Sequence, residues 1–270
     1  MQYGYTLLLV GGIYLRVWSR FLRWRIRLWL QRIRNTESTQ THMKQTLLVI
    51  RHGQTTWNVE HRLPGQLPGV PLNDVGRQQA ATLAEALSVL PISAIISSPL
   101  ERAYSTAEII AKGRELNVQL EPDLMDTDVG PWSGKIIEEL AKNDPAWKEY
   151  VKDPSVAPEG VETFPQVQQR SVAAIERWRK HENIGAYPAF VAHADVVKLL
   201  VAHYTGLEAK RAGSLFIDNA SVSIIEIDDE HHHSHVLSIG WSPRPGWLKP
   251  PVPITPQSKE PTQEAGEQKT

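Results

Sequence analysis

The sequence predicts an α/β fold, a three-layer α/β/α sandwich in which helices cover both faces of a mainly parallel central sheet. Two observations support this prediction. From residue 45 to about residue 240, short apolar runs typical of buried strands alternate with longer segments of helical periodicity. Polar side chains directly follow several of these runs, as they do at the carboxyl edge of an open α/β sheet.

The expected elements follow one another in a regular order. The first strand is the run Thr46-Leu47-Leu48-Val49-Ile50. Further strands are expected at residues 94–97, 189–192, 221–227 and 236–239. Helices are expected at residues 75–90, 99–111, 136–143, 164–181 and 195–204. Ser98 and Pro99 are expected to start the second of these helices, as its N-cap and its first-turn proline.

The composition is that of one globular domain with an extension at each end. The chain has 270 residues, 41% of them hydrophobic, and we assign residues 43–241 to a single core. The absence of cysteine excludes disulfides, a thiolate nucleophile and cysteine-ligated metal sites. Residues 242–270 are rich in Pro, Gln, Glu and Lys, and we expect a disordered tail there.

Residues 1–42 form a basic extension with the pattern of an amphipathic helix. Its apolar positions recur three and four residues apart, at Leu15, Trp18, Leu22, Ile26, Trp29 and Ile33. Arginines recur on another face, which predicts peripheral contact with a membrane through residues 14–34. The alternative is that translation starts at Met43 and that the extension was assigned in error.

The extension conceals the charge of the main body. Residues 1–42 hold seven Arg and one acidic residue, so the remainder carries about −7 although the whole chain has a formal net charge of −1. An acidic body does not suit nucleic acid, and we expect no such partner. The charge order of the first residues does not match a secretion signal, so we expect a cytoplasmic protein, or one attached to a membrane through the extension.

The strongest local signal is the run Arg51-His52-Gly53 at the end of the first expected strand. The His52 imidazole can attack phosphorus through one ring nitrogen while a backbone carbonyl holds the other. Gly53 lets the backbone approach a phosphate, and Arg51 offers a planar set of donors to its oxygens. Taken alone, the triplet has an alternative interpretation as a strand-end turn with a solvated arginine and a capping histidine.

Two further residues are expected at the same edge of the sheet. Arg102 falls in the first turn of a helix, where free amides and the helix dipole favour an anion. His193 follows an apolar strand and precedes a helix, so it can donate a hydrogen bond to a phosphoryl oxygen. This convergence favours a phosphate site over the strand-end turn.

In their order and spacing, these residues resemble the histidine phosphatase superfamily, the phosphoglycerate mutase-like family. That family shares an Arg-His-Gly run, a second Arg, a second His and an acidic residue. Other matching segments are Trp57-Asn58, Ser98-Pro99-Leu100-Glu101-Arg102-Ala103, Gly130-Pro131-Trp132-Ser133-Gly134 and Val191-Ala192-His193. The resemblance covers roughly residues 45–240 and implies the phosphoglycerate mutase-like sandwich.

The resemblance also implies roles for individual residues. It implies a phosphate pocket of Arg51, His52, Arg102 and His193, with Asn58, the Gly65 loop and Ala194 at the substrate. The implied proton donor is Asp126, where the family commonly has the longer Glu; Asp128 and Asp195 are the alternative donors. Two other departures are Pro64, where the family often has a hydroxyl residue, and Ala194, where it usually has Gly.

The activity implied by the resemblance is hydrolysis of a small phosphorylated metabolite, a phosphomonoester, through a phosphohistidine on His52, with no metal and no cofactor. One alternative is a phosphoglycerate mutase, which is disfavoured because the chain lacks the longer basic insertion found after the second Arg of cofactor-dependent mutases. Another is a phosphate-binding module whose catalysis has decayed. The sequence identifies neither the substrate nor the oligomeric state.

The run His231-His232-His233-Ser234-His235 is the other concentration of candidate metal ligands. It lies between two expected strands and follows three acidic residues. We therefore interpret it as an exposed hairpin turn and not as a metal site.

Overall fold

Six strands form one central sheet in the computed structural model, which describes residues 44–244. The strands are β1 (Gln45–Arg51), β2 (Ala94–Ser97), β3 (Val118–Leu120), β4 (Pro188–Ala192), β5 (Val222–Asp228) and β6 (His233–Trp241). Their order is β3-β2-β4-β1-β5-β6. The first four in this order are parallel, whereas β5 pairs antiparallel with β1 and β6 antiparallel with β5. The predicted mainly parallel sheet is confirmed.

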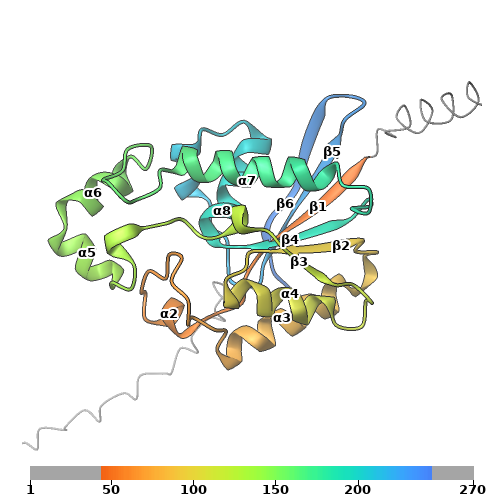
Figure 1. The fold of residues 1–270 in the computed structure, drawn as a ribbon, viewed down its shortest axis with the longest axis horizontal. Helices are drawn as coiled ribbons and strands as arrows, with labels where there is room; N and C mark the ends of the chain where they lie inside the picture. Colours follow the sequence, from red (N-terminus) through yellow and green to blue (C-terminus); the bar gives the residue numbers. More distant parts are fainter. Residues whose placement is uncertain (1–43, 245–270) are drawn as a thin grey trace, which may run out of the picture.

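Helices cover both faces of this sheet, as Figure 1 shows. The α-helices are α2 (Thr56–Val59), α3 (Asp74–Ala86), α4 (Glu101–Ala111), α5 (Ile137–Asn143), α6 (Pro145–Lys152), α7 (Phe164–Arg179) and α8 (Ala194–Thr205). Short 3₁₀ turns are η1 (Leu87–Val89), η2 (Pro122–Leu124), η3 (Gly130–Trp132) and η4 (Ala209–Ser214). Helices α3 and α4 pack on one face, and α7 and α8 pack on the other, which is the predicted sandwich.

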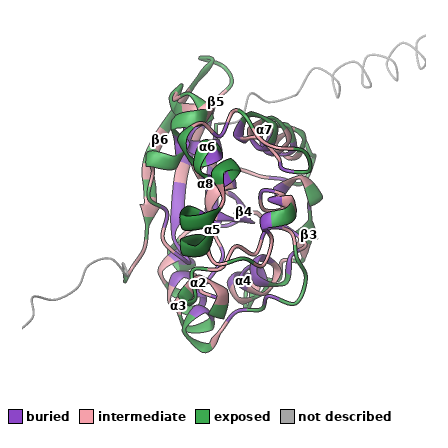
Figure 2. Cartoon of the chain, turned by 90° about the vertical axis from the view of Figure 1, so that its left-hand side faces the viewer, coloured by how far each residue is buried: buried purple, intermediate pink, exposed green. Residues whose placement is uncertain are grey.

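The alternation of side chains along β1 explains the two helical layers. Leu47 and Val49 belong to the apolar core beneath α7 and α8, whereas Leu48 and Ile50 belong to the core beneath α3 and α4. All four are fully buried. Each such burial stabilises the fold by roughly 1.5–3 kcal/mol. Seen from the left-hand side of Figure 1, the central strands are buried between helices with exposed outer surfaces, whereas β6 runs along an exposed edge of the sheet (Figure 2).

Helices α5 and α6 extend beyond the carboxyl edge of the sheet (Figure 1) and are held by an aromatic cluster. The ring of Trp132 lies 5.1 Å from that of Trp147 and 5.3 Å from that of Tyr150, and Tyr150 lies 6.1 Å from Phe164. The indole N–H of Trp132 donates to Asp144 at 3.0 Å. These packed rings give the extension its own small core.

The start of α4 differs from the prediction. Ser98 is not the N-cap and Pro99 is not in the first turn, because α4 begins at Glu101 with Leu100 as its cap. The Ser98 hydroxyl accepts from the Leu100 amide at 3.3 Å and pairs with His193 at 2.9 Å, and it does not cap the first amides of α4. Three elements that the sequence analysis did not predict are α2, β3 and α6, each of eight residues or fewer.

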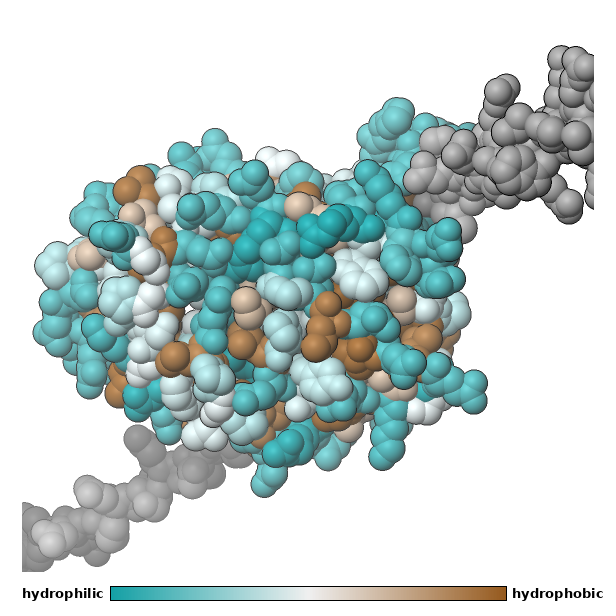
Figure 3. Space-filling view, viewed as in Figure 1, coloured by the Kyte–Doolittle hydropathy of each residue, from teal (hydrophilic) through white to brown (hydrophobic). Residues whose placement is uncertain are grey.

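The histidine-rich run begins in the expected hairpin turn, and its last three residues belong to β6. Strand β5 ends at Asp228, β6 starts at His233, and His231 and His232 are exposed between them. Among residues 44–244 no group of three or more His, Asp or Glu is arranged to hold a metal ion. Within the same range no helix has the length and apolarity needed to cross a bilayer. In the view of Figure 1 the surface is mostly hydrophilic, with apolar side chains scattered among polar ones (Figure 3).

The predictions for residues 1–42 and for the tail after residue 244 lie outside the described residues.

The first turn of α3 packs directly against the backbone that follows β1. A Cβ atom at Gly53 would lie 2.4 Å from the Gly76 carbonyl oxygen, and one at Gly76 would lie 2.0 Å from the Gln54 oxygen. Neither approach is possible for a residue with a side chain. The two glycines therefore allow α3 to support the segment that carries His52.

We expect Gly76→Ala to lower the free energy of unfolding by about 1–3 kcal/mol, because the added methyl group has no space. Urea denaturation measures the effect. Gly213→Ala is the matched control, since a Cβ there meets nothing within 4 Å, and it should leave the free energy almost unchanged. Equal stability of the two variants would contradict the close packing.

Candidate active site

His52 occupies the first position after β1 and is 2% exposed. Its backbone N–H donates to Ala192 on the neighbouring strand at 3.0 Å, and its carbonyl accepts from Ala220 at 3.0 Å. The ring Nδ1 lies 2.7 Å from the Gly53 carbonyl oxygen. Because a carbonyl only accepts, Nδ1 carries the proton, and Nε2 keeps its lone pair. The predicted tautomer is therefore the one that the geometry favours.

The surroundings of His52 keep its ring neutral. Burial lowers the pKa of the imidazole well below its ordinary value of 6.5, and the charges of Arg102 and Arg51 lower it further. A neutral imidazole with a free Nε2 lone pair is a nucleophile. The local chemistry of His52 therefore fits the role predicted for it.

His193 lies beside His52, with the two ring centroids 5.2 Å apart. It is fully buried, its Nε2 pairs with the Ser98 hydroxyl at 2.9 Å, and its Nδ1 has no hydrogen-bond partner among residues 44–244. Ser98 accepts from the Leu100 amide, and within residues 44–244 its hydroxyl hydrogen has His193 Nε2 as its acceptor. That arrangement leaves the proton on Nδ1, as a donor for an incoming oxygen. Burial and the charge of Arg102 lower the pKa of His193 well below its ordinary value.

Arg51 and Arg102 complete a cationic pocket, which we define as Arg51, His52, Arg102 and His193. Arg102 is 1% exposed and donates to the Gly65 carbonyl at 2.8 Å and to Asp126 at 3.1 Å. Arg51 donates to the Ile217 carbonyl at 2.7 Å. The Nε atoms of both arginines are buried and have no hydrogen-bond partner within the described part of the chain. Unused donors on buried guanidinium groups are typical of a site that binds an anion.

Asp126 approaches this pocket from the loop after η2. One carboxylate oxygen accepts from Arg102 and lies 3.7 Å from Nδ1 of His193, and the other accepts from the Thr127 amide at 3.0 Å. Burial raises the pKa of Asp126 above its ordinary value of 3.8; Arg102 opposes this shift, and the nearby Asp195 carboxylate adds to it. A carboxyl group with a raised pKa is suited to donate a proton.

The three residues predicted at the substrate all lie near the pocket. The Asn58 side-chain oxygen accepts from the Thr55 amide and hydroxyl, at 3.0 and 3.1 Å, and from Asn219 at 3.2 Å, so that oxygen has a structural role. Gly65 is buried, has a positive φ of 49° and offers its carbonyl to Arg102. Ala194 is the first residue of α8, next to His193.

Some residues that support the pocket were missed by the sequence analysis. The Thr106 hydroxyl accepts from the Gly53 amide at 3.0 Å and donates to the Arg102 carbonyl at 2.7 Å. Asn219 donates to the His52 carbonyl at 3.2 Å. The only available signal for Thr106 was its position one helical turn after Arg102. Asn219 had no local signal, because its partner lies far away in the sequence.

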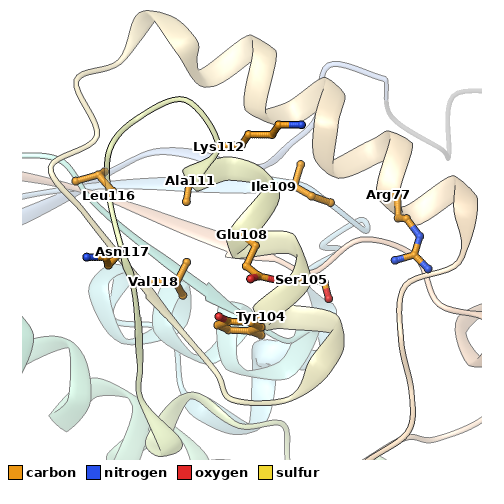
Figure 4. Close-up of a pocket in the computed structure, with 10 residues that line it drawn as sticks. All are labelled: Arg77, Tyr104, Ser105, Glu108, Ile109, Ala111, Lys112, Leu116, Asn117 and Val118. Carbon is orange, nitrogen blue, oxygen red and sulfur yellow. The ribbon is translucent and has the colours of Figure 1, made fainter.

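A surface hollow elsewhere on the molecule is lined by other residues than the cationic pocket. It lies over α4 and the connection to β3, and its lining includes Tyr104, Glu108 and Lys112 (Figure 4). None of the predicted site residues lines it. It offers no buried cation, so the cationic pocket remains the candidate active site.

A family model for the histidine phosphatase superfamily (branch 1) matches residues 47–239. The chain belongs to this superfamily. The match includes every residue of the cationic pocket as well as Asp126. The expected family and fold class are therefore confirmed, and relatives of this chain are named as phosphatases or as mutases.

Individual relatives carry both kinds of name. The chain is 32% identical to phosphoserine phosphatase 1 of Hydrogenobacter thermophilus over 69% of this chain and 88% of that protein. It is 32% identical to a probable phosphoglycerate mutase of Photorhabdus laumondii, over 72% of this chain and 88% of that protein. A bifunctional protein of Mycobacterium tuberculosis is 36% identical over 67% of this chain, which spans only 50% of that relative. The solved structure of a mycobacterial glucosyl-3-phosphoglycerate phosphatase with VO3 is 28% identical, with a TM-score of 0.65, over 72% of this chain and 98% of that one.

The free donors of the pocket lead to a prediction for ligand binding. We expect orthophosphate at about 100 times its Kd to add about 2.7 kcal/mol to the free energy of unfolding, measured by thermal or urea denaturation. Arg51→Met should lose most of this gain, because it removes a buried guanidinium from the pocket. Arg77→Met, on the exposed surface of α3, should keep the whole gain. A gain that survives Arg51→Met would place the anion elsewhere.

The lowered pKa of His52 predicts how stability depends on pH. Below about pH 6.5 the unfolded chain protonates this ring, whereas the folded protein keeps it neutral, so the unfolded state binds more protons. The free energy of unfolding should therefore fall as the pH falls, and more steeply in the parent than in His52→Asn. The two slopes should differ by about 1.4 kcal/mol per pH unit. This difference ends at the folded-state pKa of His52.

Urea denaturation between pH 7.5 and 5.5 measures these slopes. The raised pKa of Asp126 acts in the opposite direction, but Asp126 is present in both proteins. His203→Asn changes an exposed residue of α8 and should keep the slope of the parent, because both buried histidines remain. Parallel curves for the parent and His52→Asn would refute a neutral His52.

Proposed function

We propose that this protein is a phosphatase that hydrolyses a small phosphomonoester through a phosphohistidine on His52. The observation that carries the proposal is the buried, neutral His52, whose unprotonated Nε2 accompanies two arginines with unused Nε donors. Relatives named as phosphatases support the same reaction class.

In the first half-reaction, Nε2 of His52 attacks phosphorus, and the P–N bond forms as the bond to the ester oxygen breaks. Asp126 gives its proton to the leaving oxygen, so an alcohol departs. Arg51, Arg102 and Nδ1–H of His193 hold the equatorial oxygens, whose charge is spread in the transition state. The shifts favour the protonation states that this step needs, because the raised pKa of Asp126 makes its carboxyl group easier to protonate and the lowered pKa of His52 leaves its ring neutral.

In the second half-reaction, water attacks the phosphohistidine. Asp126, now ionised, accepts a proton from the water, and the P–N bond breaks with release of orthophosphate. His52 and Asp126 return to their starting protonation states. The same two side chains therefore act in both steps, as microscopic reversibility requires.

A phosphoglycerate mutase is the second candidate, because relatives with that name match most of the domain. A mutase would return the phosphoryl group to another hydroxyl of its substrate instead of to water. The sequence disfavours the mutase, because the chain lacks the longer basic insertion found after the second Arg of cofactor-dependent mutases.

The test is phosphate release by the full chain from p-nitrophenyl phosphate, 3-phosphoglycerate, sugar phosphates and nucleotides, without added metal. We expect His52→Ala to lower the rate at least about 1,000-fold, since it removes the nucleophile. His203→Ala, on the exposed surface of α8, should retain the parent rate.

The remaining outcomes separate the alternatives. If the parent converts 3-phosphoglycerate to 2-phosphoglycerate in the presence of bisphosphoglycerate and releases no phosphate, the mutase is the correct assignment. If it does neither, the result favours a phosphate-binding module. Turnover that survives His52→Ala would refute the phosphohistidine.

Two further parts of the proposal concern the whole chain. We propose that the protein acts in the cytoplasm on a small phosphorylated metabolite and has no nucleic-acid partner, consistent with its acidic main body. Peripheral membrane contact through residues 14–34 is proposed from the sequence pattern alone, because these residues lie outside the described range.

A further inference from the structure

Arg170 on α7 binds the main chain of the segment that carries Asp126. One terminal nitrogen donates to the carbonyls of Asp123 and Met125, at 2.7 and 2.8 Å. The other donates to the carbonyl of Asp126 itself at 2.9 Å. These three bonds hold consecutive parts of one loop from a single rigid group on a helix.

Glu162 fixes Arg170 and holds the far end of the same loop. Its two carboxylate oxygens accept from Nε and a terminal nitrogen of Arg170, both at 2.8 Å. One of these oxygens also accepts from the Asp128 amide at 2.8 Å, and the Glu162 amide donates to the Asp128 carbonyl at 2.8 Å. With these contacts all five N–H donors of the Arg170 guanidinium are used.

The loop is also tied to the substrate side of the pocket. The Gln66 side chain donates to the Asp126 carbonyl at 2.9 Å, so that carbonyl receives two donors. Neither Gln66 nor Arg170 has a hydrogen bond to the Asp126 carboxylate among the bonds of the described residues. Their bonds to Asp126 go to its main chain.

The position of the main chain matters for a proton donor as short as aspartate. A single methylene joins its carboxyl group to Cα, so the reach of the carboxyl is set almost entirely by the backbone. Proton transfer requires heavy atoms within about 2.6–3.2 Å of each other. Small displacements of a positioned group are costly for the rate.

We propose that Arg170, anchored by Glu162, is a positioning residue that places the Asp126 carboxyl for proton donation to the leaving oxygen. This inference rests on the proposed function, in which Asp126 is the general acid. It assigns to a partly buried ion pair outside the cationic pocket a specific effect on one step of the reaction.

The step can be isolated by changing the leaving group. A nitrophenolate departs without a proton, whereas an alkoxide needs one, so only the second depends on a well-placed acid. We expect Arg170→Lys to lower kcat/KM for an alkyl phosphate such as glycerol 2-phosphate about 10- to 100-fold, a part of the usual contribution of general acid catalysis. For p-nitrophenyl phosphate the expected change is less than about threefold, because the nucleophile and the cations are intact.

Lysine keeps the positive charge but cannot make the forked contacts, so the variant separates geometry from charge. Asp126→Asn should show the same dependence on leaving group. Adding Arg170→Lys to Asp126→Asn should cause no further loss with the alkyl ester, because both changes remove one function. Glu162→Gln keeps Arg170 but weakens its anchor. It should lower kcat/KM for the alkyl ester by a smaller factor and again leave p-nitrophenyl phosphate almost unchanged, and it replaces Arg170→Lys as the test if that variant does not fold.

Arg177→Lys is the matched control on the same helix. Arg177 is half exposed and contacts the side chains of Glu121 and Asp123, and not the loop backbone, so this variant should match the parent on both esters. An equal loss on both esters in Arg170→Lys, with Asp126→Asn still selective, would overturn the positioning role alone. A parent that releases phosphate from neither ester would overturn the proposed function and the positioning role with it.

Discussion

The parallel pairing of β1 with β4 is the constraint on which the rest of the site depends. In this register Arg51 lies opposite Ala192, so the next residues along the two strands are His52 and His193. A shift by one residue would displace one ring by about 3.3 Å and would reverse the faces of every side chain on that strand. The fully buried apolar residues of both strands fix the register, and through it the distance between the two rings.

Around these two rings the structure combines buried cations with one carboxyl group. Burial opposes the charged forms of His52 and Asp126, and it therefore moves their pKa values in opposite directions. The arginines strengthen the effect on the histidine and oppose it on the aspartate. The result is a neutral base next to a carboxyl group that is harder to ionise, which is the pairing needed for transfer of a phosphoryl group with protonation of the departing oxygen.

The sequence was sufficient for the parts of the molecule that depend on local pattern or on position at a strand end. The long strands and the main helices could be predicted from their periodicity. Arg51, His52 and His193 could be predicted because apolar runs end at Ile50 and Ala192, and Arg102 because it falls at the start of an expected helix. The role of Ser98 was predicted wrongly. Its hydroxyl could either cap a helix or bind another side chain, and in the structure it binds His193, which lies 95 residues away in the sequence.

Other support for the site had no local signature. Arg170 lies 44 residues after Asp126 in the chain, and its helical periodicity indicates only a position on α7. Its role follows from the approach of α7 to one loop, which is a property of the tertiary packing. The same holds for Asn219, which reaches the His52 carbonyl from the connection before β5. Short elements such as β3 were also beyond the pattern, because three residues give no measurable period.

The order of the strands also has a consequence for the folding of the chain. His52 and His193 are separated by about half of the full sequence, and they meet only after β1 and β4 have paired across the intervening segments. Contacts between such distant residues form slowly, because a long loop must close before they stabilise the chain. Secondary structure and even a collapsed core can therefore precede a working site during refolding. For the proposed function, turnover should therefore recover no earlier than the pairing of β1 with β4, because both histidines take part in it.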